Sequence, residues 1–171
     1  KNSSVEGWSA GTSVAPDAWT LTGVGASIAR ESGAGNVQDG VYSAAITNGA
    51  SAVADLGQSL TISDTQNTRL RGRQVVFSAR VKTSTASRAF VRLDDGVVTR
   101  DSRFHVGDGT FETLAVTFTV DAAATKVEVS VEIATGAAIT IYADSLQLEE
   151  GAVATAFSTR PGELSRFSGT F

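Results

Sequence analysis

Apolar and polar residues alternate along much of this chain with a period of two. The clearest run is residues 126–133, in which Val127, Val129, Val131 and Ile133 alternate with Lys126, Glu128, Ser130 and Glu132. Successive side chains of a β-strand point to opposite faces, so this period sends one apolar row into a core and one polar row to the surface. The pattern predicts half-buried strands and disfavours a helical bundle, whose apolar residues recur every three or four positions.

Eight further segments are predicted as strands. They are residues 19–22, 26–31, 41–47, 51–56, 73–82, 88–93, 111–120 and 138–148. In the last of these, Ile141 points inward but Leu146 follows in the opposite phase, which predicts a β-bulge or break near residues 143–145. A helical turn is expected within residues 63–70, capped by Ser63 or Asp64.

Glycine-bearing turns such as Asn48-Gly49 and Asp108-Gly109 separate the predicted strands. Many short strands at this spacing are typical of an all-β antiparallel β-sandwich, which we expect over residues 1–159. The alternation is lost in residues 160–171, which are predicted to be a short C-terminal arm or linker.

Composition narrows the possible functions. The 171 residues include no cysteine and one histidine, which excludes disulfides, thiolate metal sites and multi-histidine zinc sites. Asp and Glu number 18 against 14 Lys and Arg, so we expect no binding to nucleic acid. The longest charge-free stretch, residues 40–54, is interrupted by polar residues, and no membrane insertion is expected.

Few residues are candidates for catalysis. His105 has Arg103 and Asp101 nearby and can be read as a general base, or as a structural histidine at a strand end. Glu128 and Glu132 share one strand face about 13 Å apart, farther than the carboxyl pair of a glycosidase, and are expected to be solvated. The sequence therefore predicts no enzyme activity.

Several segments in order resemble the jelly-roll carbohydrate-binding modules that accompany xylanases and glucanases. They are V-E-G-W-S at 5–9, P-D-A-W-T-L at 16–21, G-N-V-Q-D-G-V-Y-S-A at 35–44, L-R-G-R at 70–73 with V-F-S-A-R-V-K at 76–82, and I-Y-A-D-S-L-Q-L-E at 141–149. The resemblance implies a jelly roll and one structural calcium, held by Glu6, Asp39 and Asp144 with backbone carbonyls. Oxygen ligands suit calcium, although the three can also be ordinary turn carboxylates.

The end of the chain carries a second resemblance. L-Q-L-E-E-G at 146–151 and A-T-A-F-S-T-R-P at 154–161 are similar to an ending common in virion proteins of tailed bacteriophages. There the same sandwich serves as a tail-fibre, appendage or capsid-decoration module. This implies a non-catalytic structural or adhesion module of the virion, whose partners are other virion proteins or identical subunits and a cell-surface polysaccharide. The alternative is a carbohydrate-binding module of a secreted, extracellular glycoside hydrolase.

Sugar binding requires aromatic rings and polar groups on an open face. In the predicted register Arg80, Phe90, Arg92 and Tyr142 point away from the core and can form one glycan-binding patch. Phe90 can equally be a contact between subunits. Trp8 and Trp19 are expected to cap the core instead.

In the arm, Phe167 and Phe171 are spaced i and i+4. Two exposed phenylalanines lower solubility, so we expect them to contact another subunit. The alternative is that the arm folds back on its own sandwich.

Overall fold

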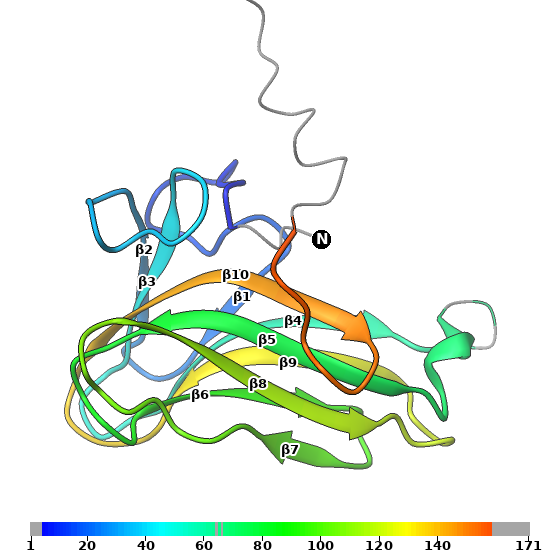
Figure 1. The fold of residues 1–171 in the computed structure, drawn as a ribbon. Coiled ribbons are helices and arrows are strands. Elements are labelled where there is room, and N and C mark those ends of the chain that lie inside the picture. Colours follow the sequence, from blue (N-terminus) through cyan, green and yellow to red (C-terminus); the bar gives the residue numbers. More distant parts are fainter. Residues whose placement is uncertain (1–4, 64, 66, 159–171) are drawn as a thin grey trace, which may run out of the picture.

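A computed structural model describes residues 5–63, 65 and 67–158. Two five-stranded sheets pack face to face (Figure 1), and every strand pair within them is antiparallel. Sheet A has the order β1-β4-β9-β6-β7 and sheet B the order β2-β3-β10-β5-β8. This arrangement confirms the predicted antiparallel β-sandwich.

The nine predicted segments all contain strands. In chain order the strands are β1 (Thr20–Thr22), β2 (Ser27–Glu31), β3 (Ser43–Thr47), β4 (Ala54–Thr61), β5 (Gln74–Lys82), β6 (Ala89–Asp94), β7 (Thr99–Asp101), β8 (Phe111–Thr119), β9 (Lys126–Ile133) and β10 (Thr140–Glu150). β4 runs beyond the predicted end at residue 56 because it pairs with β9 along its whole length. β7 was not predicted, since its three residues are all exposed and show no alternation.

The helical turn is shorter than expected. A 3₁₀ helix, η1, covers Thr68–Leu70, and Asn67 rather than Ser63 precedes it; Asp64, the other expected cap, lies outside the described residues. Asn67 has a φ of 55°, and its side-chain amide donates a hydrogen bond to the Thr61 carbonyl at 2.8 Å. Asparagine tolerates this left-handed backbone better than most residues, which explains why the turn begins there.

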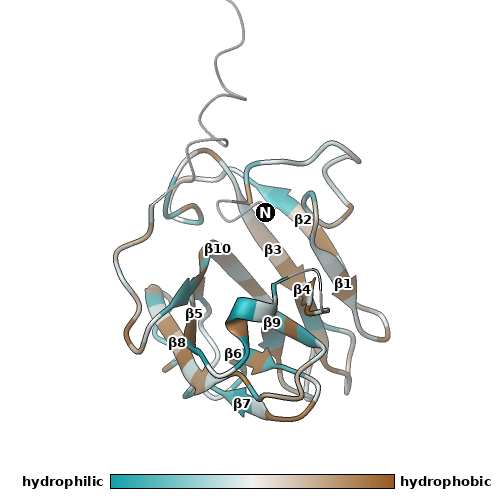
Figure 2. Cartoon of the chain, turned by 90° about the vertical axis from the view of Figure 1, so that its right-hand side faces the viewer, coloured by the Kyte–Doolittle hydropathy of each residue, from teal (hydrophilic) through white to brown (hydrophobic). Residues whose placement is uncertain are grey.

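The inward rows of both sheets form one hydrophobic core, and hydrophobic stretches appear in brown on strands of both sheets in Figure 2. The predicted inward residues of β9 are buried, with Val127, Val131 and Ile133 fully covered. Ser130 and Glu132, predicted to point outward to solvent, are buried as well. Trp8 and Trp19 belong to the same core, which confirms their expected role. Among the described residues no helix is long and apolar enough to cross a membrane.

The predicted irregularity in β10 is present. The pairing of β10 with β5 shifts register between Asp144 and Gln147, and Ser145 has a φ of 52°. This β-bulge lets Ala143 and Leu146 both face the core. It also leaves Asp144 opposite Arg80, on the outer side of sheet B.

Candidate functional site

Charged side chains of both signs gather on the outer face of sheet A. We call this surface the polar face, and its residues are Asp55, Gly57, Ser59, Phe90, Arg92, Asp94, Asp101, Lys126, Glu128, Ser130 and Glu132. The strand register arranges them in cross-strand rows. One row is Thr22, Asp55, Glu132 and Phe90, and the next is Thr20, Gly57, Ser130, Arg92 and Asp101.

Both cations of the polar face are already paired. Arg92 forms a bidentate ion pair with Asp101, in which Nε and Nη2 lie 2.6 and 2.9 Å from the two carboxylate oxygens. Its Nη1 lies 3.0 Å from Glu132 Oε1. Lys126 lies 2.8 Å from both Asp94 and Glu128. Glu132, expected to be solvated, is instead buried, because Arg92 and the neighbouring strands cover it. The prediction for Glu132 was therefore wrong.

Asp55 differs from the other carboxylates of this face. Its Oδ1 atom is buried and has no hydrogen-bond partner. Burial, reinforced by the nearby Glu132 and Glu128 carboxylates, raises the pKa of Asp55 to about 7. Burial also raises the pKa of Glu132. Perturbed carboxyls of this kind gather at functional sites more often than elsewhere.

The absence of a side chain at Gly57 lets Asp55 Oδ1 lie close to the backbone of β4. A Cβ atom at Gly57 would lie 3.0 Å from Asp55 Oδ1 and 3.6 Å from Glu128 Oε1. The next residue in its row is the small Ser130, whose hydroxyl donates to Glu132 Oε1 at 3.0 Å. A glycine inside a strand weakens the strand, and it often marks a close approach by a ligand or another backbone.

One aromatic pair borders the polar face. The rings of Phe90 and Phe104 meet edge to face with centroids 5.2 Å apart, and Arg92 lies 5.3 Å above the Phe90 ring. Phe90, predicted to be an exposed sugar contact, is therefore buried, with 6% of its surface exposed, and Phe104 is the exposed ring at 45%. Phe104 lies in the β7–β8 connection, where no alternation marks it in the sequence.

The four predicted glycan contacts do not form one patch. Phe90 and Arg92 lie on β6 of sheet A, but Arg80 lies on β5 and Tyr142 on β10 of sheet B. The outer faces of the two sheets are on opposite sides of the molecule, so the prediction of one shared patch was wrong. Alternation separates inward from outward side chains but carries no information about which sheet a strand joins.

The outer face of sheet B is partly covered by the β2–β3 loop. Lys82 lies between Phe111 and Tyr142, at 6.0 and 5.8 Å from the two ring centroids. Its amino group donates to the Gly35 carbonyl at 2.6 Å and to Asn36 Oδ1 at 3.0 Å. Tyr142, Lys82 and Phe111 are directly opposed on the neighbouring strands β10, β5 and β8. The sequence analysis did not identify Lys82 or Phe111 as part of this surface.

The three expected calcium ligands, Glu6, Asp39 and Asp144, all lie around the end of the β2–β3 loop. Glu6 Oε1 accepts hydrogen bonds from the backbone N–H groups of Val41 and Tyr42 at 2.8 and 2.9 Å. Asp144 Oδ2 accepts from the N–H groups of Gln38 and Asp39 at 2.8 and 3.0 Å. The carboxylates thus hold this loop against the sandwich through backbone hydrogen bonds.

These side chains do not fit a calcium cage. Asp144 Oδ1 accepts from the Ser145 N–H at 2.7 Å, and the Ser145 hydroxyl donates to Asp39. Glu6 Oε2 is buried without a hydrogen-bond partner, but one such oxygen is far from the six to eight that calcium takes. Within the described residues, no three Asp, Glu or His side chains come close enough to hold a metal ion. The ligand set that the family resemblance implies is therefore not assembled in this structure.

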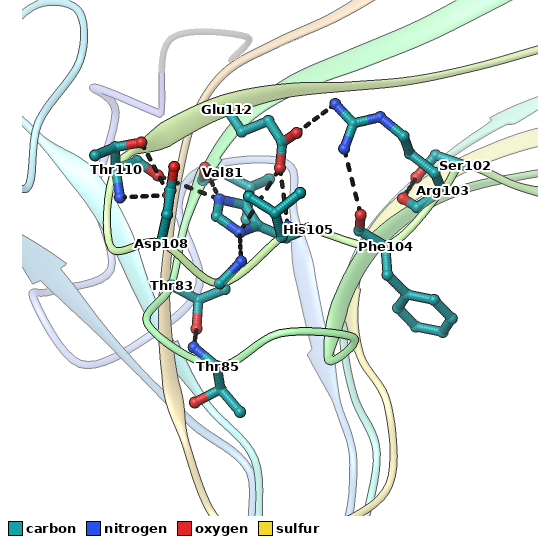
Figure 3. Close-up of polar contacts among 12 residues, drawn as sticks. Val81, Thr83, Thr85, Ser102, Arg103, Phe104, His105, Asp108, Thr110 and Glu112 are labelled. Atoms are coloured by element: carbon teal, nitrogen blue, oxygen red, sulfur yellow. Dashed lines mark hydrogen bonds and ion pairs between the residues drawn. The ribbon is translucent and has the colours of Figure 1, made fainter.

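His105 is buried among polar groups between β7 and β8 (Figure 3). Its Nε2 atom lies 3.1 and 3.2 Å from the carbonyls of Val81 and Thr110, so Nε2 carries the proton and donates to them. Its Nδ1 atom accepts from the Gly107 N–H at 2.8 Å. Both nitrogens are engaged by backbone groups, and the Glu112 carboxylate lies 3.7 Å from Nδ1.

The carboxylate beside His105 is also engaged. Glu112 forms an ion pair with Arg103 and accepts the Val106 N–H at 3.2 Å (Figure 3). The hydrogen bond from Arg103 holds the pKa of Glu112 below its usual range. His105 was expected at a strand end and is instead buried in a connection, where it ties that connection to β5. The contacts of His105 and Glu112 hold the β7–β8 connection against β5 and β8.

The fold is shared with carbohydrate-binding modules. The chain is similar to a CBM22-1 xylan-binding domain of Xyn10C from Paenibacillus barcinonensis, with a TM-score of 0.59 and 18% identity over 87% of this chain and 91% of that one. It is also similar to TmCBM61, solved in complex with β-1,4-galactotriose, with a TM-score of 0.54 and 11% identity over 79% and 90% of the two chains.

A phage protein shares the fold as well. The enzymatically active domain of tailspike protein 4 of bacteriophage CBA120 matches with a TM-score of 0.59 and 16% identity over 78% of this chain. The match spans 19% of the tailspike chain, so this sandwich corresponds to about a fifth of that protein. No protein-family model matches the sequence, and no curated protein sequence does. At these identities the likenesses show a common fold.

Proposed function

We propose that this chain is a non-catalytic glycan-binding module of the carbohydrate-binding-module type, and that the polar face of sheet A holds the sugar. The observation that carries the proposal is the buried, unpartnered Asp55 oxygen beside the side-chain-free position at Gly57. An unsatisfied buried polar atom is costly, and protein folds retain few of them. A site that awaits a hydroxyl group accounts for it.

The surroundings of Asp55 match the chemistry of a sugar. With a pKa of about 7, the Asp55 carboxyl is present near neutral pH in both protonation states and can accept or donate a hydrogen bond. Glu132 lies beside Asp55 in the same row, with its Oε1 engaged by Arg92 and Ser130. Arg92, in the adjacent row, adds donors. Phe104 supplies an exposed ring at the border, against which the apolar side of a pyranose can lie. Solved proteins of this fold include a xylan-binding domain and a module bound to galactotriose.

The geometry favours binding over cleavage. Glycosidases place two carboxyl groups on either side of the scissile bond. Asp55 and Glu132 are instead direct neighbours on adjacent strands of one sheet and face a ligand from the same side. His105, the other candidate for proton transfer, is buried with both nitrogens engaged.

Two substitutions test the proposal on the polar face. Gly57→Val fills the space beside Asp55, and Asp55→Ala removes the carboxylate. Affinity electrophoresis in gels containing xylan, β-1,4-galactan or mixed-linkage β-glucan measures retention. We expect the unchanged chain to be retarded by at least one of these polymers. Each variant should weaken that binding at least tenfold.

Matched controls separate a binding defect from a folding defect. Ala115→Val adds an apolar group to the outer face of sheet B, and Asp108→Ala removes an exposed carboxylate from a turn. Both should bind like the unchanged chain. All variants should keep its circular dichroism spectrum. Failure to bind any of the polymers, or equal binding by the polar-face variants and the controls, contradicts the proposal.

Catalysis is tested on the same polymers. Incubation with the purified chain should release no reducing ends. Release that disappears in Asp55→Asn or Glu132→Gln would identify an enzyme instead of a binding module.

A second candidate is a structural or adhesion module of a tailed-phage virion. Two observations favour it, the likeness to the tailspike domain and the resemblance of residues 146–161 to a common virion-protein ending. The two candidates overlap, since a virion module can itself bind a cell-surface glycan. Mass spectrometry of purified particles separates them. Many copies of the chain per particle would support the virion module. A catalytic hydrolase domain in the same secreted polypeptide would support the carbohydrate-binding module of an extracellular enzyme.

A further inference from the structure

A cavity lies on the outer face of sheet B, on the side of the molecule opposite the polar face of sheet A. Its volume is about 330 Å³. The floor is formed by β5, β8 and the bulge of β10, and the walls by the β2–β3 loop and the segment after β10, which turns back toward the strands (Figure 1). Its lining includes Gln38, Asp39, Arg80, Thr113, Ser145 and Phe157.

Polar groups of opposite charge converge on this cavity. The Arg80 guanidinium donates to Thr113 Oγ1 at 2.8 Å and to Gln38 Oε1 at 3.0 Å. Its third nitrogen, Nε, is buried and has no hydrogen-bond partner. On the other side, the Ser145 hydroxyl donates to the Asp39 carboxylate. One cation and one anion line the cavity, so it presents donors and acceptors with little net charge.

The backbone is strained where it forms the floor. Ser145 has a φ of 52° at the bulge of β10, a conformation that costs free energy in residues other than glycine. The bulge turns its side chain outward to meet Asp39. Bulges that redirect a side chain are common beside functional sites. The Arg80 donor and the Ser145 strain are independent observations, and both fall in this cavity.

The walls are held in place. The Asp144 carboxylate fixes the Gln38 and Asp39 backbone on one side. On the other side, Thr155 donates to Glu149 from both its N–H and its hydroxyl, at 3.0 and 2.6 Å. Phe157, half-buried, follows Thr155 and gives this wall one aromatic ring. The cavity is thus formed before any ligand arrives, which lowers the entropic cost of binding.

We propose that this cavity is a second binding site, for a single uncharged sugar unit such as a monosaccharide or the end of a chain. Ligand pockets run from about 300 to 1,000 Å³, so this one holds a single ring and excludes a chain bound along its length. The aromatic wall offers a surface for the apolar side of the ring. Hydroxyl groups of the sugar can hydrogen-bond to the Asp39 carboxylate, the Ser145 hydroxyl and the Gln38 amide. Their oxygens can also accept from the terminal N–H groups of Arg80 that Thr113 and Gln38 do not use.

Nuclear magnetic resonance of the full chain tests the site. The probes are the methyl glycosides of xylose, glucose and galactose, each titrated into isotope-labelled protein. We expect saturable shifts of the Arg80 Nε–H signal and of the Gln38 and Ser145 amides with at least one probe. Phe157→Ala should weaken this binding at least fivefold, and Arg80→Met at least tenfold. Arg73→Met, which removes an exposed arginine before β5, should leave it unchanged.

The outcomes keep this site distinct from the polar face. Gly57→Val, which blocks the polar face, should leave the monosaccharide shifts at Arg80 intact. Absence of saturable shifts at Arg80 with all three probes overturns the proposal. Equal binding by Phe157→Ala, Arg80→Met and Arg73→Met does so too. Neither result bears on polymer binding at the polar face, which the electrophoresis measures separately.

Discussion

Asp55 on β4 and Glu132 on β9 are directly opposite each other in neighbouring strands, and burial raises the pKa of both carboxyls. Like charges at directly opposed positions destabilise a sheet. Arg92 contacts Glu132 at 3.0 Å and offsets part of that repulsion. An arrangement that costs stability is expected where the side chains serve a function, and this pair is the centre of the proposed glycan site.

The first prediction concerns pH and Asp55. Its pKa is about 7 in the folded state, against 3.8 as the ordinary value. The folded state therefore binds this proton more tightly than the unfolded chain. As the pH falls from 8 through 7 toward 4, Asp55 contributes a rise in the free energy of unfolding, which levels off below pH 4. At pH 8 the ionised Asp55 is a cost to the folded state.

Asp55→Asn removes this cost. We expect the variant to be more stable than the unchanged chain by roughly 1–2 kcal/mol at pH 8, after allowance for partial solvent exposure. At pH 4 the difference should vanish. Urea unfolding at both pH values gives the comparison, and a variant that is less stable at pH 8 would contradict the assigned environment.

The second prediction concerns the carboxylate under the β2–β3 loop. Asp144→Ala removes the acceptor of three backbone N–H groups, those of Gln38, Asp39 and Ser145. We expect a loss of about 2–4 kcal/mol in the free energy of unfolding, because each buried donor left without a partner is costly. Asp108→Ala, at an exposed turn, should lose less than about 1 kcal/mol. A similar loss in both variants would show that the loop is not held by Asp144.

The third prediction concerns calcium. The carboxylates of Glu6, Asp39 and Asp144 engage backbone N–H or hydroxyl groups instead of sharing a cage. We therefore expect the melting temperature to be the same after dialysis against a chelator and after addition of millimolar calcium. A ligand present at 100 times its dissociation constant adds about 2.7 kcal/mol. A calcium-dependent rise of that size, lost in Glu6→Gln, would restore the site implied by the family resemblance.

The fourth prediction concerns His105. His105→Ala breaks the contacts of the imidazole with Val81, Thr110 and Gly107 and leaves a buried cavity. We expect a loss of about 2–4 kcal/mol in the free energy of unfolding, with no change in glycan binding at temperatures where the variant is folded. Unfolding and affinity electrophoresis on the same sample check both parts. A loss of binding without a loss of stability would give His105 a direct role.

The fifth prediction concerns the C-terminal arm. Residues 160–171, with Phe167 and Phe171, lie outside the described residues, and their contact with another subunit stays a prediction. If the arm connects subunits, truncation after Thr159 should convert an oligomer into a monomer in light scattering. An unchanged oligomeric state would show that the arm is not the connector.

The sequence by itself determined the strands and their inward rows. Val127, Val131 and Ile133 are buried because alternation is a property of one strand, and it can be read without knowledge of any partner. The bulge of β10 could be predicted for the same reason, because the apolar residues change from odd to even positions between Ile141 and Leu146. The acidic character of the chain and its lack of cysteine are likewise independent of the fold.

The tertiary structure decided which outward rows meet. Arg80 and Phe90 both point away from the core, yet they lie on opposite sides of the molecule because β5 and β6 join different sheets. The pKa of Asp55 is raised only in the folded sheet, where burial desolvates its carboxyl and the pairing of β4 with β9 places Glu132 beside it. Phe104 reaches Phe90 from a connection with no periodic pattern. Strand pairing depends on contacts between segments far apart in the chain, and no local repeat records them.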